Sequence, residues 1–101
     1  MTIIEEVDER LQNRQAAQAL EIIQKYLQQF PNDKQLLLKQ YEVLLSLNRL
    51  PHARNVLVKL VKLFPNDEQI RARLTMITEI MRFEEKDIYA STNLNNDPWL
   101  D

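Results

Sequence analysis

Apolar residues recur along this chain at spacings of three and four positions, which is the period of an amphipathic helix. Glycine is absent, and the only four prolines stand at positions 31, 51, 65 and 98. Long segments without these residues favour helix. The pattern predicts five helices, over residues 2–13, 16–30, 34–47, 51–64 and 68–83, with a short sixth helical piece near 84–90.

The prolines and asparagines predict where these helices begin and end. Pro31 and Pro65 are expected to stop the helices before them, because the residue preceding proline is pushed out of the α region. Pro51 suits a first helical turn, where its missing N–H is no loss. Asn32 and Asn66 are each followed three positions later by glutamine, which is the spacing of a capping box. The two asparagines are therefore predicted to cap the third and fifth helices.

The helices differ in how many apolar faces they carry. The first and the fifth each have one stripe and a polar back, and the stripes consist of Ile3, Ile4, Val7 and Leu11, and of Ile70, Leu74, Ile77 and Met81. The third helix has apolar residues on two sides: Leu37, Leu38, Tyr41 and Leu45, and Leu36, Val43 and Leu47. A helix that is apolar on both sides is packed on both sides. The third helix is thus predicted to lie in the middle of the fold.

One segment of the chain occurs twice. Residues 30–33 and 64–67 both read Phe-Pro-Asn-Asp, at an offset of 34 residues, and Ala19 and Ala53 keep the same offset. A fixed period of this size indicates a supersecondary unit repeated in tandem, each copy hiding its apolar face against the next.

A period of 34 with two antiparallel helices per unit resembles the tetratricopeptide repeat family. Ala19 and Ala53 match the family's small residue where two helices approach closely, and Asn48 matches its turn position. Other matches are Leu27, Val61, Pro31 and Pro65, whereas Leu37 and Tyr41 replace the family's early Trp and Gly, and Asp87 replaces the small residue of a third unit. The resemblance implies an all-α, right-handed solenoid of five to six helices. Residues 1–90 would hold repeats at about 1–33, 34–67 and, incompletely, 68–90, followed by a C-terminal tail over 91–101.

The resemblance also implies a site. Tetratricopeptide proteins typically bind peptides or helices on the concave surface formed by the first helix of each repeat. In this register the groove is lined by Ile4, Asp8, Leu11, Leu38, Lys39, Glu42, Leu45, Ala72, Arg73 and Met76. The apolar members of this set are alternatively plain core residues.

One branch of the family grips the C-terminal carboxylate of heat-shock chaperones with lysines, asparagines and an arginine. Only Arg73 stands at a matching position here, and Ile4, Asp8, Lys39 and Gln69 occupy the others. No chaperone clamp is predicted.

Composition excludes several other functions. A net charge of −2 and a pI near 5.4 give no reason to expect nucleic-acid binding. The charge is uneven, at −3 over residues 1–33, +4 over 34–67 and −3 over 68–101. With no cysteine, a single histidine (His52) and no glycine, the chain offers no thiolate metal site, catalytic triad or phosphate-binding loop. No enzyme activity, cofactor or metal is expected, and without a signal or membrane-spanning stretch the cytoplasm is the expected location.

Beyond Ser91 the helical pattern gives way to Asn, Asp and Pro, so a non-helical tail is predicted. Its Trp99 is the only tryptophan and lies beside Leu100. Tryptophan is a frequent interface anchor. The pair either packs locally on its own domain or docks into a groove of a partner or a second copy.

The sequence therefore predicts an adaptor or scaffold that binds a peptide or helix of another protein. Two alternatives stay open: a self-assembling homodimer or larger oligomer, and a small chaperone for a secretion or pilus-assembly subunit. The second alternative requires a markedly apolar groove, which Asp8, Lys39, Glu42 and Arg73 interrupt.

Overall fold

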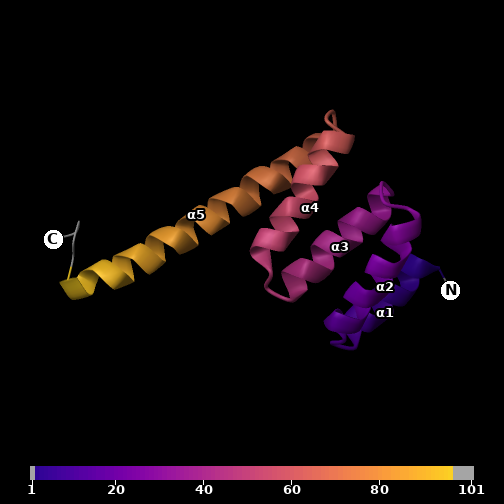
Figure 1. Cartoon of the computed structure of the whole chain (residues 1–101), viewed down its shortest axis with the longest axis horizontal. Coiled ribbons are helices and arrows are strands. Elements are labelled where there is room, and N and C mark those ends of the chain that lie inside the picture. The colour runs from indigo at the N-terminus through magenta and orange to yellow at the C-terminus, as the bar shows by residue number, and fades with distance from the viewer. Residues whose placement is uncertain (1, 97–101) are drawn as a thin grey trace.

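The computed structural model describes residues 2–96, with side chains described for residues 2–83. It contains α1 (Ile3–Gln12), α2 (Ala16–Gln29), α3 (Lys34–Ser46), α4 (Leu50–Leu63) and α5 (Glu68–Asn96). The helices α1 and α2 form one hairpin and α3 and α4 a second one beside it, while α5 lies against α4 (Figure 1). The all-α repeat prediction is confirmed for these residues; the right-handed sense of the stack stays a prediction.

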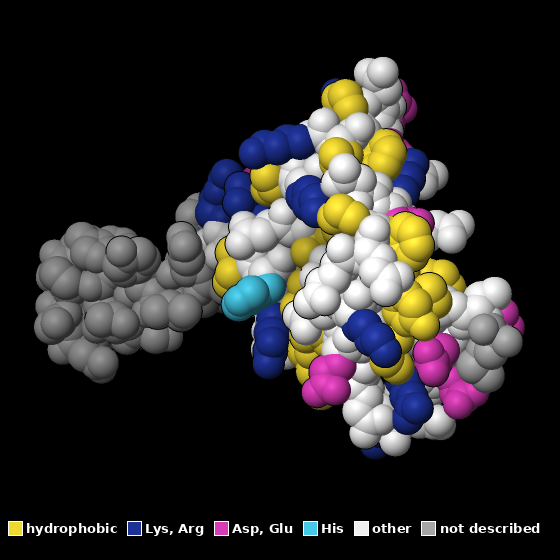
Figure 2. Space-filling view, turned by 45° about the vertical axis from the view of Figure 1, so that its right-hand side comes forward, with side chains coloured by type: hydrophobic (Ala, Val, Ile, Leu, Met, Phe, Trp, Pro, Cys, Tyr) yellow, Lys and Arg dark blue, Asp and Glu magenta, His cyan; other side chains and the backbone are white. Residues whose placement is uncertain are grey.

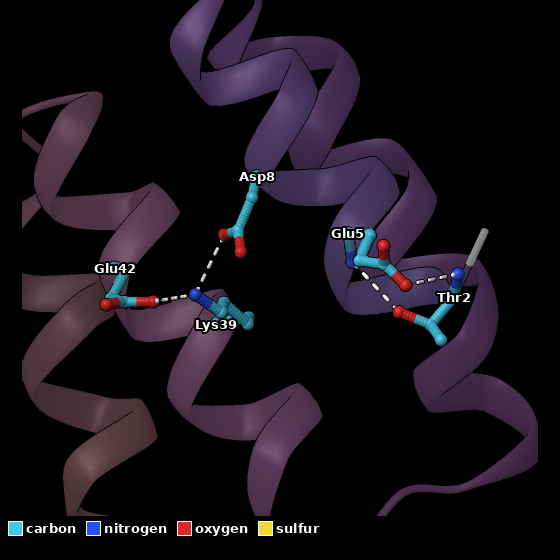
Figure 3. Close-up of polar contacts among 5 residues, drawn as sticks. All are labelled: Thr2, Glu5, Asp8, Lys39 and Glu42. Atoms are coloured by element: carbon cyan, nitrogen blue, oxygen red, sulfur yellow. Dashed lines mark hydrogen bonds and ion pairs between the residues drawn. The ribbon is translucent and has the colours of Figure 1, made fainter.

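The caps of α3 and α5 lie one residue beyond the predicted asparagines. Asp33 and Asp67 each accept a hydrogen bond from the backbone N–H three residues on, at 3.0 and 3.1 Å. The prediction of Asn32 and Asn66 is wrong because α3 begins at Lys34 and α5 at Glu68, which puts the aspartates at the N-cap. A complete capping box instead opens α1, where Thr2 and Glu5 bond each other's backbone N–H (Figure 3).

The second helix of each hairpin ends as the prolines predict. The residues before them, Phe30 and Phe64, have φ of −129° and ψ of 69° and 68°, outside the α region. Pro51 lies in the first turn of α4, as expected.

The first helix of each hairpin ends in a left-handed residue. Arg14 has φ of 60° and Asn48, 34 positions later, has φ of 58°. In both turns the N–H groups of this residue and of the next one bond carbonyls of the helix's last turn, at 2.8–3.1 Å. This is the Schellman arrangement, so the turn repeats with the same period as the sequence.

The core runs between the hairpins. Ala19 and Ala53 are fully buried, as expected of small residues at close helix–helix contacts. The middle helix α3 buries residues on two faces, as predicted: Leu36, Leu37, Val43 and Leu44. It packs against α1, α2 and α4.

The last helix differs from the prediction. Residues 68–83, the short sixth piece and the start of the tail form one continuous helix of 29 residues that ends at Asn96. At residue 82, 34 positions after Asn48, the chain stays helical, because Glu84-Glu85-Lys86-Asp87 offers no apolar face that could fold back as a second helix.

The predicted boundary between residues 90 and 91 falls inside α5, so the expectation of a non-helical tail from Ser91 is wrong as far as residue 96. Asn and Asp weaken a helix by less than ~1 kcal/mol each, whereas a proline disfavours helix at the residue before it. The helix accordingly persists to within two positions of Pro98. Trp99 and Leu100, the predicted anchor, lie outside the described residues.

Candidate protein-binding groove

A charged cluster joins α1 to α3. The ammonium group of Lys39 lies 2.8 Å from Oδ1 of Asp8 on α1 and 3.0 Å from Oε2 of Glu42 on its own helix (Figure 3). Only 22% of the Lys39 side chain is exposed, against 44% and 47% for the two acids. Lys39 therefore acts first as a tie between two helices.

The electrostatics of this cluster fix the charge of Lys39. The hydrogen bond to Asp8, together with the nearby Glu42, raises the pKa of Lys39 above its ordinary value, although burial works in the opposite direction. A group whose pKa is higher in the folded state than in the unfolded state stabilises the fold. This stabilisation is fully present at pH values below the unfolded-state pKa and is lost as the pH rises through the folded-state pKa. The tie is consequently intact throughout the neutral range.

Arg73 extends the cluster onto α5. By the 34-residue period, Arg73 is the counterpart of Lys39, and Glu42 is the counterpart of Asp8. Its guanidinium carbon lies 6.0 Å from the centre of the Tyr41 ring, within cation–π range. Among the residues with described side chains, the ion pairs do not include Arg73. Acidic and basic side chains thus alternate across α1, α3 and α5.

A cavity of about 420 Å³ lies over this cluster. It is lined by Thr2, Ile4, Gln35, Leu38, Lys39, Glu42 and Arg73, from the start of α1, α3 and α5. Within residues 2–83, the backbones of α3 and α5 do not approach each other closely, which leaves space between them. A second cavity of about 250 Å³ shares Thr2, Ile4 and Gln35 and reaches the exposed Phe30.

The structure thus brings part of the predicted set together. One cavity is lined by five of these residues: Ile4, Leu38, Lys39, Glu42 and Arg73. Asp8 forms an ion pair with Lys39. Leu45 and Met76 are exposed, at 37% and 64%, as is Ala72. Leu11 is half-buried and packs against the core, as the core alternative for the apolar members anticipated.

Sequence reasoning missed two residues of the cavity and two exposed apolar residues of α5. Thr2 and Gln35 line the cavity, although their polar character gave no signal. Met76, Ile80 and Phe83 are 64%, 44% and 65% exposed and follow one another at spacings of four and three on α5. We call these three residues the α5 strip. Met76 was predicted as a groove residue, whereas Ile80 and Phe83 were missed because the prediction for this helix rested on its other apolar stripe.

The surface in the space-filling view is mixed in character. Hydrophobic side chains form an interrupted band over the helical body, flanked by lysines and arginines, and most of the acidic side chains in view gather towards the lower right (Figure 2).

The described residues offer neither a metal site nor a membrane span. In that part of the chain no three His, Asp or Glu side chains come together as metal ligands would. None of the helices as described is both long and apolar enough to cross a bilayer.

Antiparallel helical hairpins with a 34-residue period and an open face formed by their first helices define a helical-repeat protein. Residues 10–77 match the family model described as tetratricopeptide repeat, and the chain belongs to this family. This match confirms the resemblance inferred from the sequence. No curated protein matches the chain. Members of this family are typically non-catalytic modules of protein–protein interaction.

Proposed function

We propose that this chain is a non-catalytic adaptor that binds a helix or an extended peptide of a partner protein in the groove over α1, α3 and α5. The observation that supports the proposal most is the 420 Å³ cavity, because five of the ten residues predicted for a peptide groove line it together. Concave sites with a few placed polar groups are where proteins bind ligands most often.

The lining of the cavity suggests what a bound segment would present. Ile4 and Leu38 offer an apolar floor for one large side chain. Lys39 is occupied by two acids, so Arg73 is the cation best placed to meet an incoming group. We expect an amphipathic segment with an apolar anchor and an acidic residue close to it.

Arg73 is the residue to test. Arginines near the centre of an interface are frequent hot spots worth ~2 kcal/mol or more, which corresponds to roughly a thirtyfold change in affinity. Lys39 is unsuitable for the same experiment, because its removal would leave Asp8 and Glu42 facing each other and would disturb the α1–α3 contact.

The experiment compares three forms of the protein as bait for partners from the organism that encodes it. Arg73→Glu should lose a partner that the unchanged protein captures, and Arg71→Glu should retain it. Arg71 is a matched control, since it is also exposed, lies on the same helix and does not line the cavity.

The captured segment is then titrated into isotope-labelled protein. Amide shifts are expected around Ile4, Leu38 and Arg73 and not around His52 at the start of α4. Equal affinity of the Arg73→Glu and Arg71→Glu forms, with shifts confined to α2 or α4, would move the binding site to the opposite face.

A further inference from the structure

The α5 strip is the basis of an inference that does not rest on the proposed groove function, although Met76 lies three positions from Arg73 of the groove on the same helix. We infer that two copies of this chain pair through Met76, Ile80 and Phe83, with α5 of one copy antiparallel to α5 of the other.

The strip is an unusual concentration of exposed apolar surface. Among residues 2–83, five large hydrophobic side chains are exposed, and three of them form this strip. The other two, Phe30 and Leu45, lie at the end of α2 and on α3. Isolated exposed apolar residues are ordinary, but contiguous ones mark interaction sites.

No other helix covers the strip. α5 packs on α4 through its other apolar stripe, which includes Ile70 and Ile77, each only 2% exposed. Its backbone does not come close to that of α3 in the described part of the chain. In Figure 1 the second half of α5 projects beyond the body formed by α1–α4, so the helix is accessible to a second molecule along much of its length.

The strip is complementary to itself under a twofold axis. With Ile80 on the axis, an antiparallel partner sets Ile80 against Ile80, and Met76 against Phe83 of the second copy. Isologous contacts of this kind give closed dimers. Methionine sulfur against an aromatic ring is a favourable contact.

Charge selects the antiparallel orientation. Residues 68–83 contain three arginines and two glutamates, whereas residues 84–96 contain one lysine and three acids. Antiparallel helices place the net basic half of one copy on the net acidic half of the other. Parallel helices would place like on like.

The helix is long enough for such a pair. Its 29 residues span ~43 Å at 1.5 Å per residue. A two-helix interface of this length lies near the lower limit for specific association, so we expect a dissociation constant on the order of micromolar.

The first test measures mass against concentration, by sedimentation velocity from ~1 to ~300 µM. The unchanged protein should shift from monomer to dimer. Ile80→Glu and Phe83→Glu should each raise the dissociation constant at least ~10-fold. Phe30→Glu, which puts the same charge in place of another exposed aromatic residue elsewhere, should leave it unchanged.

The second test uses the absence of cysteine. Under mild oxidation Ile80→Cys should form a covalent dimer, and Thr75→Cys, exposed on another face of α5, should not. Spin labels at residue 69 should lie ~33 Å apart in an antiparallel pair, from about eleven residues of rise on either side of the axis. Labels within ~15 Å of each other would indicate a parallel pair and contradict the inference.

Two further outcomes would overturn the inference. One is a monomeric mass at every concentration, whether the strip is exposed to solvent or covered by another segment of the same molecule. The other is a dimer that Phe83→Glu leaves intact. The groove is tested with Arg73→Glu in partner capture and the strip with Phe83→Glu in sedimentation, so the dimer and the groove can fail separately.

Discussion

Glycine substitutions at three positions spaced 34 residues apart, 14, 48 and 82, should change the free energy of unfolding by amounts that differ in sign and size. Arg14 and Asn48 close α1 and α3 with φ of 60° and 58°, whereas Arg82 lies inside α5. All three side chains are exposed, so replacing them removes little packing. Glycine should therefore act chiefly through the backbone.

The magnitudes follow from the backbone of each site. A left-handed conformation costs a residue with a Cβ atom roughly 1–2 kcal/mol, and glycine avoids this cost. Glycine is also more flexible in the unfolded chain, which offsets ~0.5–1 kcal/mol of the stabilisation. Arg14→Gly should therefore stabilise the fold by ~0.5–1 kcal/mol. Asn48→Gly should gain less, since asparagine tolerates this region better than most residues.

Arg82→Gly should instead cost ~1 kcal/mol, because glycine is unfavourable within a helix. It also loses the 3.1 Å pair with Glu79, an exposed contact that contributes only a few tenths of a kcal/mol. Arg82→Ala removes the same pair and keeps the helix, so the difference between the two variants isolates the backbone effect.

Urea titration followed by far-ultraviolet circular dichroism measures all four variants, and an unchanged m-value would show that compactness is preserved. A stabilising Arg82→Gly would refute the reasoning. It would mean that the chain turns at residue 82, as it does at 14 and 48, and that α5 is two helices.

Two further predictions concern the contacts between repeats. Ala53→Leu should cost ~1–3 kcal/mol in urea titration by overpacking a fully buried contact, while Ala17→Leu at an exposed site of α2 should change little; equal stability of the two would contradict the repeat register. The 2.6 Å contact with Lys34, helped by the Ile70 N–H, holds the pKa of Asp67 below its ordinary value, so its contribution is present above pH ~4 and is lost as the pH falls through the lowered pKa. Asp67→Asn keeps a cap and loses the ion pair, so it should lower the urea midpoint at neutral pH but not in strong acid, with Asp33→Asn as the control for the cap alone.

The helix-terminating prolines and the 34-residue repeat predicted most of the first four helices. Pro31 and Pro65 ended α2 and α4 because their effect is steric and confined to the neighbouring residue. Ala19 and Ala53 were placed in the core by the repeat, since only a small residue fits a close helix contact. The caps were missed by one position, because Asn and Asp are about equally good N-caps and only the backbone decides between neighbours.

The site was harder to predict than the fold. The groove residues followed from the repeat register, but the role of Lys39 depends on Asp8, 31 positions earlier, and no local pattern shows that contact. The equivalence of Asp8 with Glu42 and of Lys39 with Arg73 was a usable signal, because it sets alternating charges on adjacent helices. The length of α5 could not be predicted locally, since it depends on what the following segment could pack against.

The outer face of α5 explains why the residues after 82 continue this helix and do not fold back on it as a second one. In the first two repeats a second helix packs on an apolar face that includes Val7 and Leu37, which are 0% and 1% exposed. By the 34-residue period, their counterparts on α5 are Thr75 and Arg71, both exposed. A following helix would find nothing apolar there to cover, so continuing α5 costs the chain no burial. The exposed apolar surface of α5 is the strip, which lies on a different side of the helix. A surface that is complementary to itself under a twofold axis forms a closed dimer and cannot extend into a longer assembly.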